Sequence, residues 1–560
     1  MSDPAAIWRN AYRHPAVWDA GYAPLSVPEM FFACARTFGD LPLVDFLGRR
    51  FSYAECASGA VRVARGLQML GIGPGDRVGL FLPNVPHYVA AYYGALAAGA
   101  SVVNFSPLYT VNELADQVRD SNIRVMFTLS AKALLPNAWT VALQTGIEHL
   151  VVGSIAGVLP TAKSIFYRLF QASQISERPH DPRILAFSRL IDNDRDYRAP
   201  AVDPLNDVAM IQYTGGTTGT PKGAMLTHQN ITANARQIVA IDPHAGREDR
   251  MLGALPLFHI FANATVLNRT VLAGGEIVML PRFDAGQVLA AVERTRATML
   301  PGVPTMFQAL LDHPRLDRTD LSSLRVCISG GAPLAAELQA TFEARTGARI
   351  VEGYGLTESG IAAVNPYLGE ARNGTIGHPL PATLFTLADR DDPTRPAPAG
   401  EPGEILISGP QVMKGYWNRP EQTESSFVNG ALRTGDIGMI DADGYIRIVD
   451  RMKDMISVGG FKVYPSQVEA VLYGHPAIRE ALVIGVPDAY HGEMPKAFVT
   501  LNPGAIETGD VLREWANERL GKHERVIAVE IRQSLPKTLV GKLSRKELVA
   551  EERAKFAARA

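Results

Sequence analysis

One run of the chain, Tyr213-Thr-Gly-Gly-Thr-Thr-Gly-Thr-Pro-Lys-Gly223, constrains its structure more than any other stretch. Glycines in close succession let a backbone approach an anion and turn its N–H groups inward. The run also supplies a positive charge at Lys222 and hydroxyl donors at Thr214, Thr217, Thr218 and Thr220. This composition predicts a loop that wraps a polyphosphate; a glycine- and threonine-rich surface turn is the alternative interpretation.

The run differs from the phosphate-binding loop of P-loop NTPases. In that motif the lysine follows a glycine and precedes Ser or Thr at the start of a helix. Here Pro221 stands immediately before Lys222, and a proline disfavours helical backbone at the preceding residue, Thr220. We therefore expect a looser loop between two strands, the first of them at residues 208–213.

Length and composition set the broad class. A chain of 560 residues is too long for one compact core, so two or more domains are expected. A formal net charge of −2 gives no electrostatic footprint for nucleic acid. Three distant cysteines, Cys34, Cys56 and Cys327, indicate a reducing compartment and neither a disulfide framework nor a zinc site. With no secretory leader or lipidation signal recognised, we expect a cytoplasmic protein.

One long apolar stretch raises the question of a membrane span. Residues 78–112 contain no Asp, Glu, Lys or Arg. Prolines at Pro83 and Pro86 interrupt this stretch, so we interpret it as a strand at 77–82, a helix at 88–98 and a strand at 100–105. That order is typical of a covered parallel sheet.

Strand-like and helix-like stretches alternate along most of the chain, which predicts an α/β fold. Further strands are expected at residues 276–280, 298–300 and 324–329, and helices at 285–295 and 304–311. Ligands of such folds bind beyond the carboxyl ends of strands, which is where the glycine-rich loop lies.

Two shifts in composition along the chain predict domain boundaries. The proline-rich run 389–403 predicts one, before a strand at 404–408, and the charged run 450–454 predicts another, after a strand at 444–449. Beyond 454 we expect a small α+β unit. Its expected helices are residues 466–473 and 510–519, and its expected strands are 478–486 and 497–501.

Residues 159–170 are rich in Leu, Ile, Phe and Tyr, and their charged residues are Lys163 and Arg168. Such a segment fits an amphipathic helix lying on a membrane surface. A helix that packs one face on a core is the more ordinary interpretation.

A second motif, Glu352-Gly-Tyr-Gly-Leu-Thr-Glu-Ser-Gly360, follows a Ser329-Gly-Gly-Ala-Pro333 turn. The ring of Tyr354, between two glycines, can stack on a purine. Thr357 supplies a hydroxyl for a phosphate, and Glu358 is a hard oxygen ligand suited to phosphate-bound Mg²⁺.

Two more motifs complete the set. In Arg433-Thr-Gly-Asp436 the carboxylate can accept two hydrogen bonds from a ribose, although a turn-capping aspartate is the alternative. The last motif is Pro536-Lys-Thr-Leu-Val-Gly-Lys-Leu-Ser-Arg545.

In this order, from residue 51 to residue 545, the motifs resemble those of the adenylate-forming superfamily: acyl-CoA synthetases, luciferases and adenylation domains. The resemblance implies an α/β N-terminal domain (1–449) with a β-rich subdomain, a hinge (450–454) at Lys453, and a small mobile α+β domain (455–560). It also implies Mg²⁺, with ATP and CoA as co-substrates.

The resemblance assigns catalysis to Lys542, whose cation would neutralise charge as a carboxylate attacks the α-phosphate, together with Thr357, Glu358 and His259. Lys537 is expected to be only a solvated charge. ATP contacts are implied at Thr214, Gly215, Gly216, Thr217, Thr218, Gly219, Lys222, Gly331, Ala332, Gly353, Tyr354, Gly355, Asp436 and Arg451. Metal contacts are implied at Glu358 and Thr217, and CoA contacts at Gly459, Gly460 and Lys462. A hairpin turn is the alternative interpretation of Gly459-Gly460.

The acyl pocket is expected to be lined by Phe258, His259, Gly302, Val303, Gly330 and Gly331, with His259 gating it. Residues 260–267 contain no acid, which argues against amino-acid substrates. A glycine at 216, where a serine is commoner in the superfamily, resembles bacterial long- and medium-chain fatty acyl-CoA ligases. We therefore expect a fatty acid–CoA ligase.

Several alternatives are open. A dicarboxylate or aryl-acid CoA ligase would use the same mechanism, and an acyl-AMP ligase would donate to a carrier protein. A nucleotide-binding scaffold without turnover is the alternative from another class. A homodimer and peripheral contact with the inner face of the membrane are also open expectations.

Overall fold

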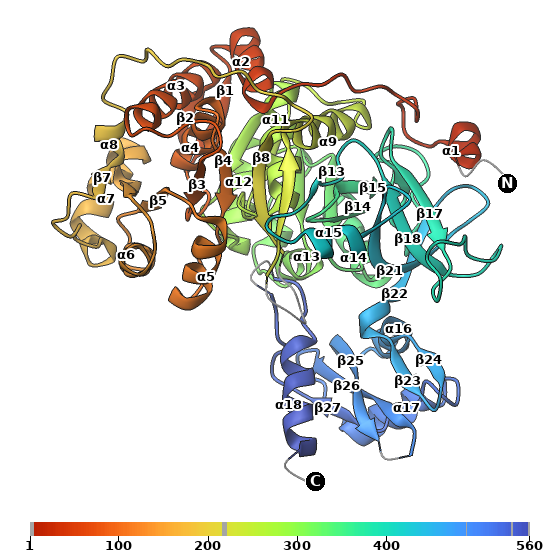
Figure 1. The fold of residues 1–560 in the computed structure, drawn as a ribbon. Coiled ribbons are helices and arrows are strands. Elements are labelled where there is room, and N and C mark those ends of the chain that lie inside the picture. Colours follow the sequence, from red (N-terminus) through yellow and green to blue (C-terminus); the bar gives the residue numbers. More distant parts are fainter. Residues whose placement is uncertain (1–4, 215–220, 489, 539–540, 558–560) are drawn as a thin grey trace.

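The computed structural model describes residues 5–214, 221–488, 490–538 and 541–557. A large N-terminal body carries a smaller unit, drawn in blue, which begins after β22 (Ile446–Arg451) (Figure 1). Each has its own hydrophobic core: a second cluster of buried residues is drawn entirely from residues 456–529. The α/β class expected from the sequence is confirmed.

Two large sheets form the N-terminal body. The eight-stranded sheet has the order β19 (Gly415–Tyr416), β9 (Gly223–Thr227), β8 (Val208–Tyr213), β4 (Ser101–Asn104), β3 (Arg77–Leu80), β5 (Val125–Leu129), β6 (His149–Gly153) and β7 (Ile184–Ala186). The nine-stranded sheet has the order β16 (His378–Pro379), β15 (Gly360–Val364), β14 (Arg349–Leu356), β13 (Val326–Gly330), β12 (Met299–Gly302), β10 (Arg250–Gly253), β11 (Glu276–Met279), β1 (Pro42–Phe46) and β2 (Arg49–Ser52). Most neighbours are parallel, so both sheets collect loops at the carboxyl ends of their strands.

The N-terminal body also contains α-helices. They are α1 (Ala6–Ala11), α2 (Val27–Phe38), α3 (Tyr53–Met69), α4 (Pro86–Ala97), α5 (Val111–Ser121), α6 (Leu135–Gln144), α7 (Thr161–Phe170), α8 (Phe187–Leu190), α9 (His228–Ala240), α10 (Ile260–Ala262), α11 (Arg269–Ala273), α12 (Ala285–Thr295), α13 (Pro304–Leu311), α14 (Ala336–Thr346) and α15 (Pro420–Ser425). Several begin with a capping box, as at Ser26, Ser52 and Thr110. The Ser or Thr hydroxyl accepts a hydrogen bond from the backbone N–H of the Glu three residues later, and the side chain of that Glu accepts one from the backbone N–H of the Ser or Thr.

The apolar stretch 78–112 forms β3, α4 and β4, as expected. In α4 ten of the twelve residues are buried, because the helix packs on α3 and on the sheet. Across the described ranges, no helix is both long and apolar enough to cross a membrane.

A five-stranded sheet corrects the first expected boundary. Its strands are β17 (Leu384–Ala388), β18 (Gly403–Ser408), β21 (Ala431–Ile440), β20 (Phe427–Val428) and β22. Residues 389–403 join β17 to β18, which are antiparallel neighbours along their whole length. The prediction of a boundary there is wrong, because the proline-rich run is a connection within one sheet.

The C-terminal unit is α+β. Its sheet contains β24 (Phe461–Val463), β23 (Ile456–Val458), β26 (Gly492–Leu501), β25 (Ile478–Asp488) and β27 (Val529–Ile531), with α16 (Pro465–Tyr473), α17 (Gly509–Asn517) and α18 (Lys546–Ala557). Strand β26 begins five residues before the expected 497, because it pairs with β25 along its full length.

Candidate active site

The described part of the phosphate loop consists of its two ends. Strand β8 ends at Tyr213 and its antiparallel neighbour β9 begins at Gly223, so the loop joins two strands as expected. The Thr214 N–H donates to the Lys222 carbonyl over 2.9 Å and closes the base of the loop. The expected contacts at Gly215, Gly216, Thr217, Thr218 and Gly219 lie outside the described residues and stay predictions.

Tyr416 brings Lys222 and Glu358 together. Because β19 pairs with β9, Tyr416 lies beside the base of the loop. The Lys222 ammonium lies 4.6 Å from the centroid of the Tyr416 ring, and the Tyr416 hydroxyl donates to Glu358 Oε1 over 2.7 Å. Burial, reinforced by the Glu358 charge, raises the pKa of Tyr416 well above its usual value, so the hydroxyl keeps its proton. No sequence motif marks Tyr416, because only the pairing of β19 with β9 brings it to the site.

Thr357 and Glu358 occupy the turn between β14 and β15, and Gly353, Tyr354 and Gly355 belong to β14 itself. That turn lies at the carboxyl end of β14, the edge at which ligands of parallel sheets bind. The backbone N–H of Met413 donates to the Glu358 carbonyl over 2.8 Å, which ties this turn to the segment leading to Tyr416.

The expected ribose and adenine contacts form one connected group. The Tyr354 hydroxyl donates to Asp436 Oδ2 over 2.5 Å, and Arg451 Nε lies 3.2 Å from Asp436 Oδ1. Asp436 and Arg451 face each other as register partners of β21 and β22. Burial raises the pKa of Asp436, while the Arg451 cation opposes that shift. The carboxylate therefore contacts two neighbouring side chains and does not act as a turn cap.

Lys542 reaches from the C-terminal unit into the N-terminal body. Thr305 Oγ1 donates to the Gly541 carbonyl over 2.8 Å, which anchors the segment across the two parts. The Lys542 side chain lies directly over Gly331, just after β13: a Cβ added to Gly331 would overlap Lys542 Cε and lie 2.5 Å from Nζ. Gly331 and its neighbour Ala332 thus lie where the C-terminal lysine enters.

The charge on Lys542 is perturbed by its surroundings. Burial, and secondarily the Arg451 cation, lowers the pKa of Lys542 from 10.5 to about 8. Among the described residues no carboxylate forms an ion pair with Lys542. Lys537, in contrast, has an exposed side chain that lies 2.7 Å from Glu480 Oε1, so it is a solvated charge with a surface ion-pair partner, as expected.

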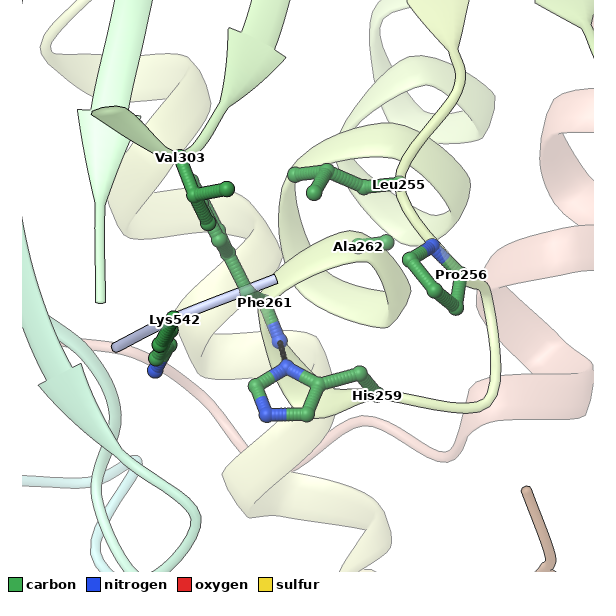
Figure 2. A pocket seen from close by; sticks show the side chains of 7 residues that line it. All are labelled: Leu255, Pro256, His259, Phe261, Ala262, Val303 and Lys542. Atoms are coloured by element: carbon green, nitrogen blue, oxygen red, sulfur yellow. Dashed lines mark hydrogen bonds between the residues drawn. The ribbon is translucent and has the colours of Figure 1, made fainter. Parts of the chain in front are cut away.

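His259 lies in the same cavity as Lys542. Figure 2 shows both side chains in a cavity whose remaining lining is apolar; it is formed by Leu255, Pro256, His259, Phe261, Ala262, Val303 and Lys542. The Phe261 N–H donates to His259 Nδ1 over 3.3 Å. Burial, and then the Lys542 cation, lowers the pKa of His259 to about 3, so its ring is neutral at physiological pH.

Two of the expected acyl-pocket residues line this cavity, and Gly302, Gly330 and Gly331 are not among its lining residues. His259 and Val303 line it, whereas Phe258 does not. Aromatic rings cover two of the glycines: a Cβ at Gly330 would lie 3.0 Å from the Phe261 ring, and one at Gly302 would lie 3.1 Å from the Phe307 ring.

A second cavity includes Ile260 of α10 in its lining. Its lining consists of Leu226, Asn230, Ile231, Asn234, Ile260, Asn263, Ala264, Gly360 and Gln411. Neither cavity has a charged side chain in its described lining apart from Lys542. Apart from Lys542, the linings of these two cavities are therefore uncharged, and that of the second includes side-chain amides.

The expected CoA contacts form a hairpin turn. Gly459 and Gly460, with φ of +55° and +87°, join β23 to β24, and Gly460 has open space where a Cβ would stand. Lys462 lies on β24, with Nζ 3.6 Å from Asp391 of the N-terminal body. Lys453 lies in a short 3-10 helix (Met452–Asp454) between β22 and β23, and burial lowers its pKa.

Glu358 is the one predicted Mg²⁺ ligand that lies among the described residues. No group of three or more His, Cys, Asp or Glu side chains with metal-binding geometry occurs there. Glu358 uses Oε1 to accept from Tyr416. Mg²⁺ is commonly held by one or two carboxylates together with substrate phosphates, and one carboxylate beside a phosphate loop fits that pattern.

Family models, relatives in sequence and solved structures all match this chain over most of its length. A family model described as AMP-binding enzyme matches residues 31–417, and one described as AMP-binding enzyme C-terminal domain matches residues 467–542. A long-chain-fatty-acid–CoA ligase of Bacillus subtilis is 41% identical over 524 residues, covering 92% of this chain and 93% of the relative. A feruloyl-CoA synthase of Amycolatopsis is 37% identical, covering 90% and 94%. The crystal structure of the anthranilate CoA ligase AuaEII with anthranoyl-AMP superposes with a TM-score of 0.83 at 27% identity, covering 96% and 99%.

Proposed function

This chain belongs to the AMP-binding enzyme family, and from that premise we propose the reaction that its site performs. The enzyme is an ATP-dependent acid–thiol ligase. It converts a carboxylic acid and ATP to acyl-AMP and pyrophosphate, and then transfers the acyl group to CoA with release of AMP. The preferred acid in this proposal is a medium- or long-chain fatty acid.

The position of Lys542 carries the proposal. Its ammonium enters an apolar cavity from the C-terminal unit, over Gly331 and beside the neutral ring of His259. A cation in such a place is preorganised to stabilise charge that develops only during reaction. The apolar lining strengthens its field, because little water is present to screen it.

In the first step a carboxylate oxygen of the acid attacks the α-phosphorus of ATP. The P–O bond to the β-phosphate breaks, and pyrophosphate takes the bonding electrons. Lys542 bridges the acid and the α-phosphate oxygens, Thr357 donates to the α-phosphate, and Lys222 holds the outer phosphates. Tyr354, Asp436 and Arg451 position the nucleoside.

Mg²⁺ would be held by Glu358 and the phosphates, where it would neutralise part of the nucleotide charge. Tyr416 orients the Glu358 carboxylate for this role by donating to Oε1. The predicted second ligand, Thr217, belongs to the same proposal.

In the second step the CoA thiolate attacks the acyl carbonyl, and AMP leaves with the electrons of the acyl–phosphate bond. We propose that the C-terminal unit turns about Lys453, so that Lys542 withdraws and the Gly459–Gly460 turn approaches the cavity. The open space at Gly460 suits a pantetheine chain running along the backbone, with Lys462 near it.

The apolar lining supports a monocarboxylic acid. A dicarboxylate would need a second cation at the far end, and the described linings of both cavities offer none. Aryl acids are the second candidate, because a feruloyl-CoA synthase and an anthranilate CoA ligase are among the similar proteins.

The test is ATP- and CoA-dependent AMP release across acids of increasing chain length, with aryl and dicarboxylic acids alongside. A smooth optimum among unbranched monocarboxylic acids is expected. Activity confined to aryl or dicarboxylic acids would refute the fatty acid substrate but keep the mechanism. Adenylate that accumulates without thioester would instead identify a donor to a carrier protein. Binding of ATP without AMP release from any acid would refute turnover.

A further inference from the structure

Helix α7 carries an apolar face that no other part of the described chain covers. Four of its large side chains are exposed: Ile165 (55%), Phe166 (54%), Leu169 (69%) and Phe170 (71%). They follow helical spacing, and the rings of Phe166 and Phe170 lie against each other with centroids 4.8 Å apart. We call these four residues the α7 face.

The opposite side of α7 attaches the helix to the body. Ser164 Oγ donates to the Ala156 carbonyl over 2.8 Å, and Tyr167 packs against the core. No residue of α7 is fully buried, and Ser164 and Tyr167, which are half-buried, form the side that packs on the body. The four residues of the α7 face are not part of that packing side. In Figure 1 the helix lies at the outer edge of the N-terminal body, next to the edge strand β7 and far from the C-terminal unit.

Basic residues flank the α7 face, and the ammonium of one of them, Lys163, donates to the Leu47 carbonyl over 2.7 Å. Residues 149–176 contain no Asp or Glu, and both Lys163 and Arg168 are exposed. Lys132 is exposed on a segment whose backbone N–H donates to the Gln174 carbonyl just beyond the helix. Within the described ranges no ion pair joins any of these three bases to a carboxylate, and Glu177 is the first acid after the helix.

We propose that the α7 face docks on an anionic lipid bilayer, lying in its interface without crossing it. An aromatic and aliphatic face flanked by lysine and arginine matches the acyl and phosphate layers of such a surface. Under the proposed function, docking also brings the site near acids that partition into membranes; only this point rests on that function.

A second copy of the chain fits the α7 face less well. With about 200 Å² for each large apolar side chain, the four exposed fractions leave about 500 Å². A stable interface buries about 800 Å² per partner. A twofold pairing through α7 would also bring the Lys163 and Arg168 cations of both copies into one interface, and like charges repel.

Flotation of the full chain with vesicles tests the proposal without nucleotide or acid, so its outcome is independent of the ligase reaction. The vesicles are phosphatidylcholine with and without phosphatidylglycerol. We expect the wild-type chain to float with anionic vesicles, and F166S/F170S to lose at least tenfold in partitioning. The double variant K163Q/R168Q should lose binding to anionic vesicles but not the weaker binding to neutral ones.

The matched control is I506S/V511S, which removes two exposed apolar residues from the C-terminal unit and should float like wild type. Unchanged melting temperature and unchanged AMP release with a water-soluble acid would show that F166S/F170S is folded. Absence of wild-type flotation, or equal flotation of F166S/F170S, overturns the proposal. A wild-type dimer that F166S/F170S converts to monomer, without flotation, assigns the α7 face to a second copy and also overturns it.

Discussion

Replacing Gly331 by alanine should displace Lys542 and stop the first half-reaction. The added Cβ would overlap Lys542 Cε, with Nζ at 2.5 Å and Cδ at 3.2 Å, and Gly331 also has a φ of +82°. The lysine must therefore leave its position over the residue. Loss of one preorganised charged group typically lowers the rate about 10²–10³-fold, which corresponds to about 2.7–4 kcal/mol.

Gly347 provides the control for backbone strain. It has a φ of +70° at the end of α14 and nothing within 4 Å of an added Cβ. Alanine at either position should lower stability by about 1–2 kcal/mol, the usual penalty for a left-handed residue with a side chain. Gly347→Ala should keep its activity, because it moves no catalytic group.

The assay measures the two half-reactions separately. Acid-dependent exchange of pyrophosphate into ATP reports adenylation, and conversion of preformed acyl-AMP and CoA to acyl-CoA reports thioester formation. Gly331→Ala should lose the exchange but keep most of the thioester formation. In a Lys542→Ala background the Gly331 substitution should lower the exchange rate by a further factor of less than about three, because both changes remove the same interaction. Two results would refute the reasoning. One is an exchange rate of Gly331→Ala within about threefold of wild type; the other is a loss of exchange in Gly347→Ala as large as that in Gly331→Ala.

Three other predictions follow from the site. Because burial lowers the pKa of Lys542 to about 8 and the cation is the active form, adenylation should decline as pH rises through 8, and Lys542→Arg should abolish that decline in a pH–rate profile. Tyr416→Phe removes the hydroxyl that orients Glu358, so the Mg²⁺ concentration for half-maximal exchange should rise about tenfold; an unchanged Mg²⁺ titration would contradict this role. Burial raises the pKa of Glu352 from 4.5 to about 8, so the folded chain retains a proton that the unfolded chain releases, and stability should fall as pH rises from about 4.5 to 8. Melting temperatures at pH 5 and pH 8 should therefore differ less for Glu352→Gln than for wild type, and an equal difference would count against a buried neutral carboxyl.

Local sequence determined much of the fold. Helices α12 (Ala285–Thr295) and α13 (Pro304–Leu311) begin and end where periodicity and the proline at residue 304 predict. Both ends of the phosphate loop lie where the apolar strand, the glycines and Pro221 indicate. These features could be predicted because turn chemistry, capping and hydrophobic period act over a few residues.

Pairing between strands that are distant in the sequence produces contacts in the site that the sequence does not predict. Arg451 meets Asp436 because β22 extends two residues past the expected end at 449, into the charged run. Tyr416 reaches Glu358 only because β19 adds to β9 across nearly two hundred residues of chain. A sequence pattern carries no information about which distant strand becomes a neighbour, so these contacts depend on the folded sheets.

The sequence by itself determined the motifs, their order and the α/β class, because each motif and each helix or strand can be recognised from residues that are close together along the chain. Only the tertiary structure decided that Gly331 must lack a side chain because Lys542 crosses it, and that the apolar face of α7 points outward. The physical reason is the same in both cases. Burial and close approach are properties of surfaces brought together from distant segments, and the same amphipathic pattern can face a core or a membrane until its surroundings are fixed.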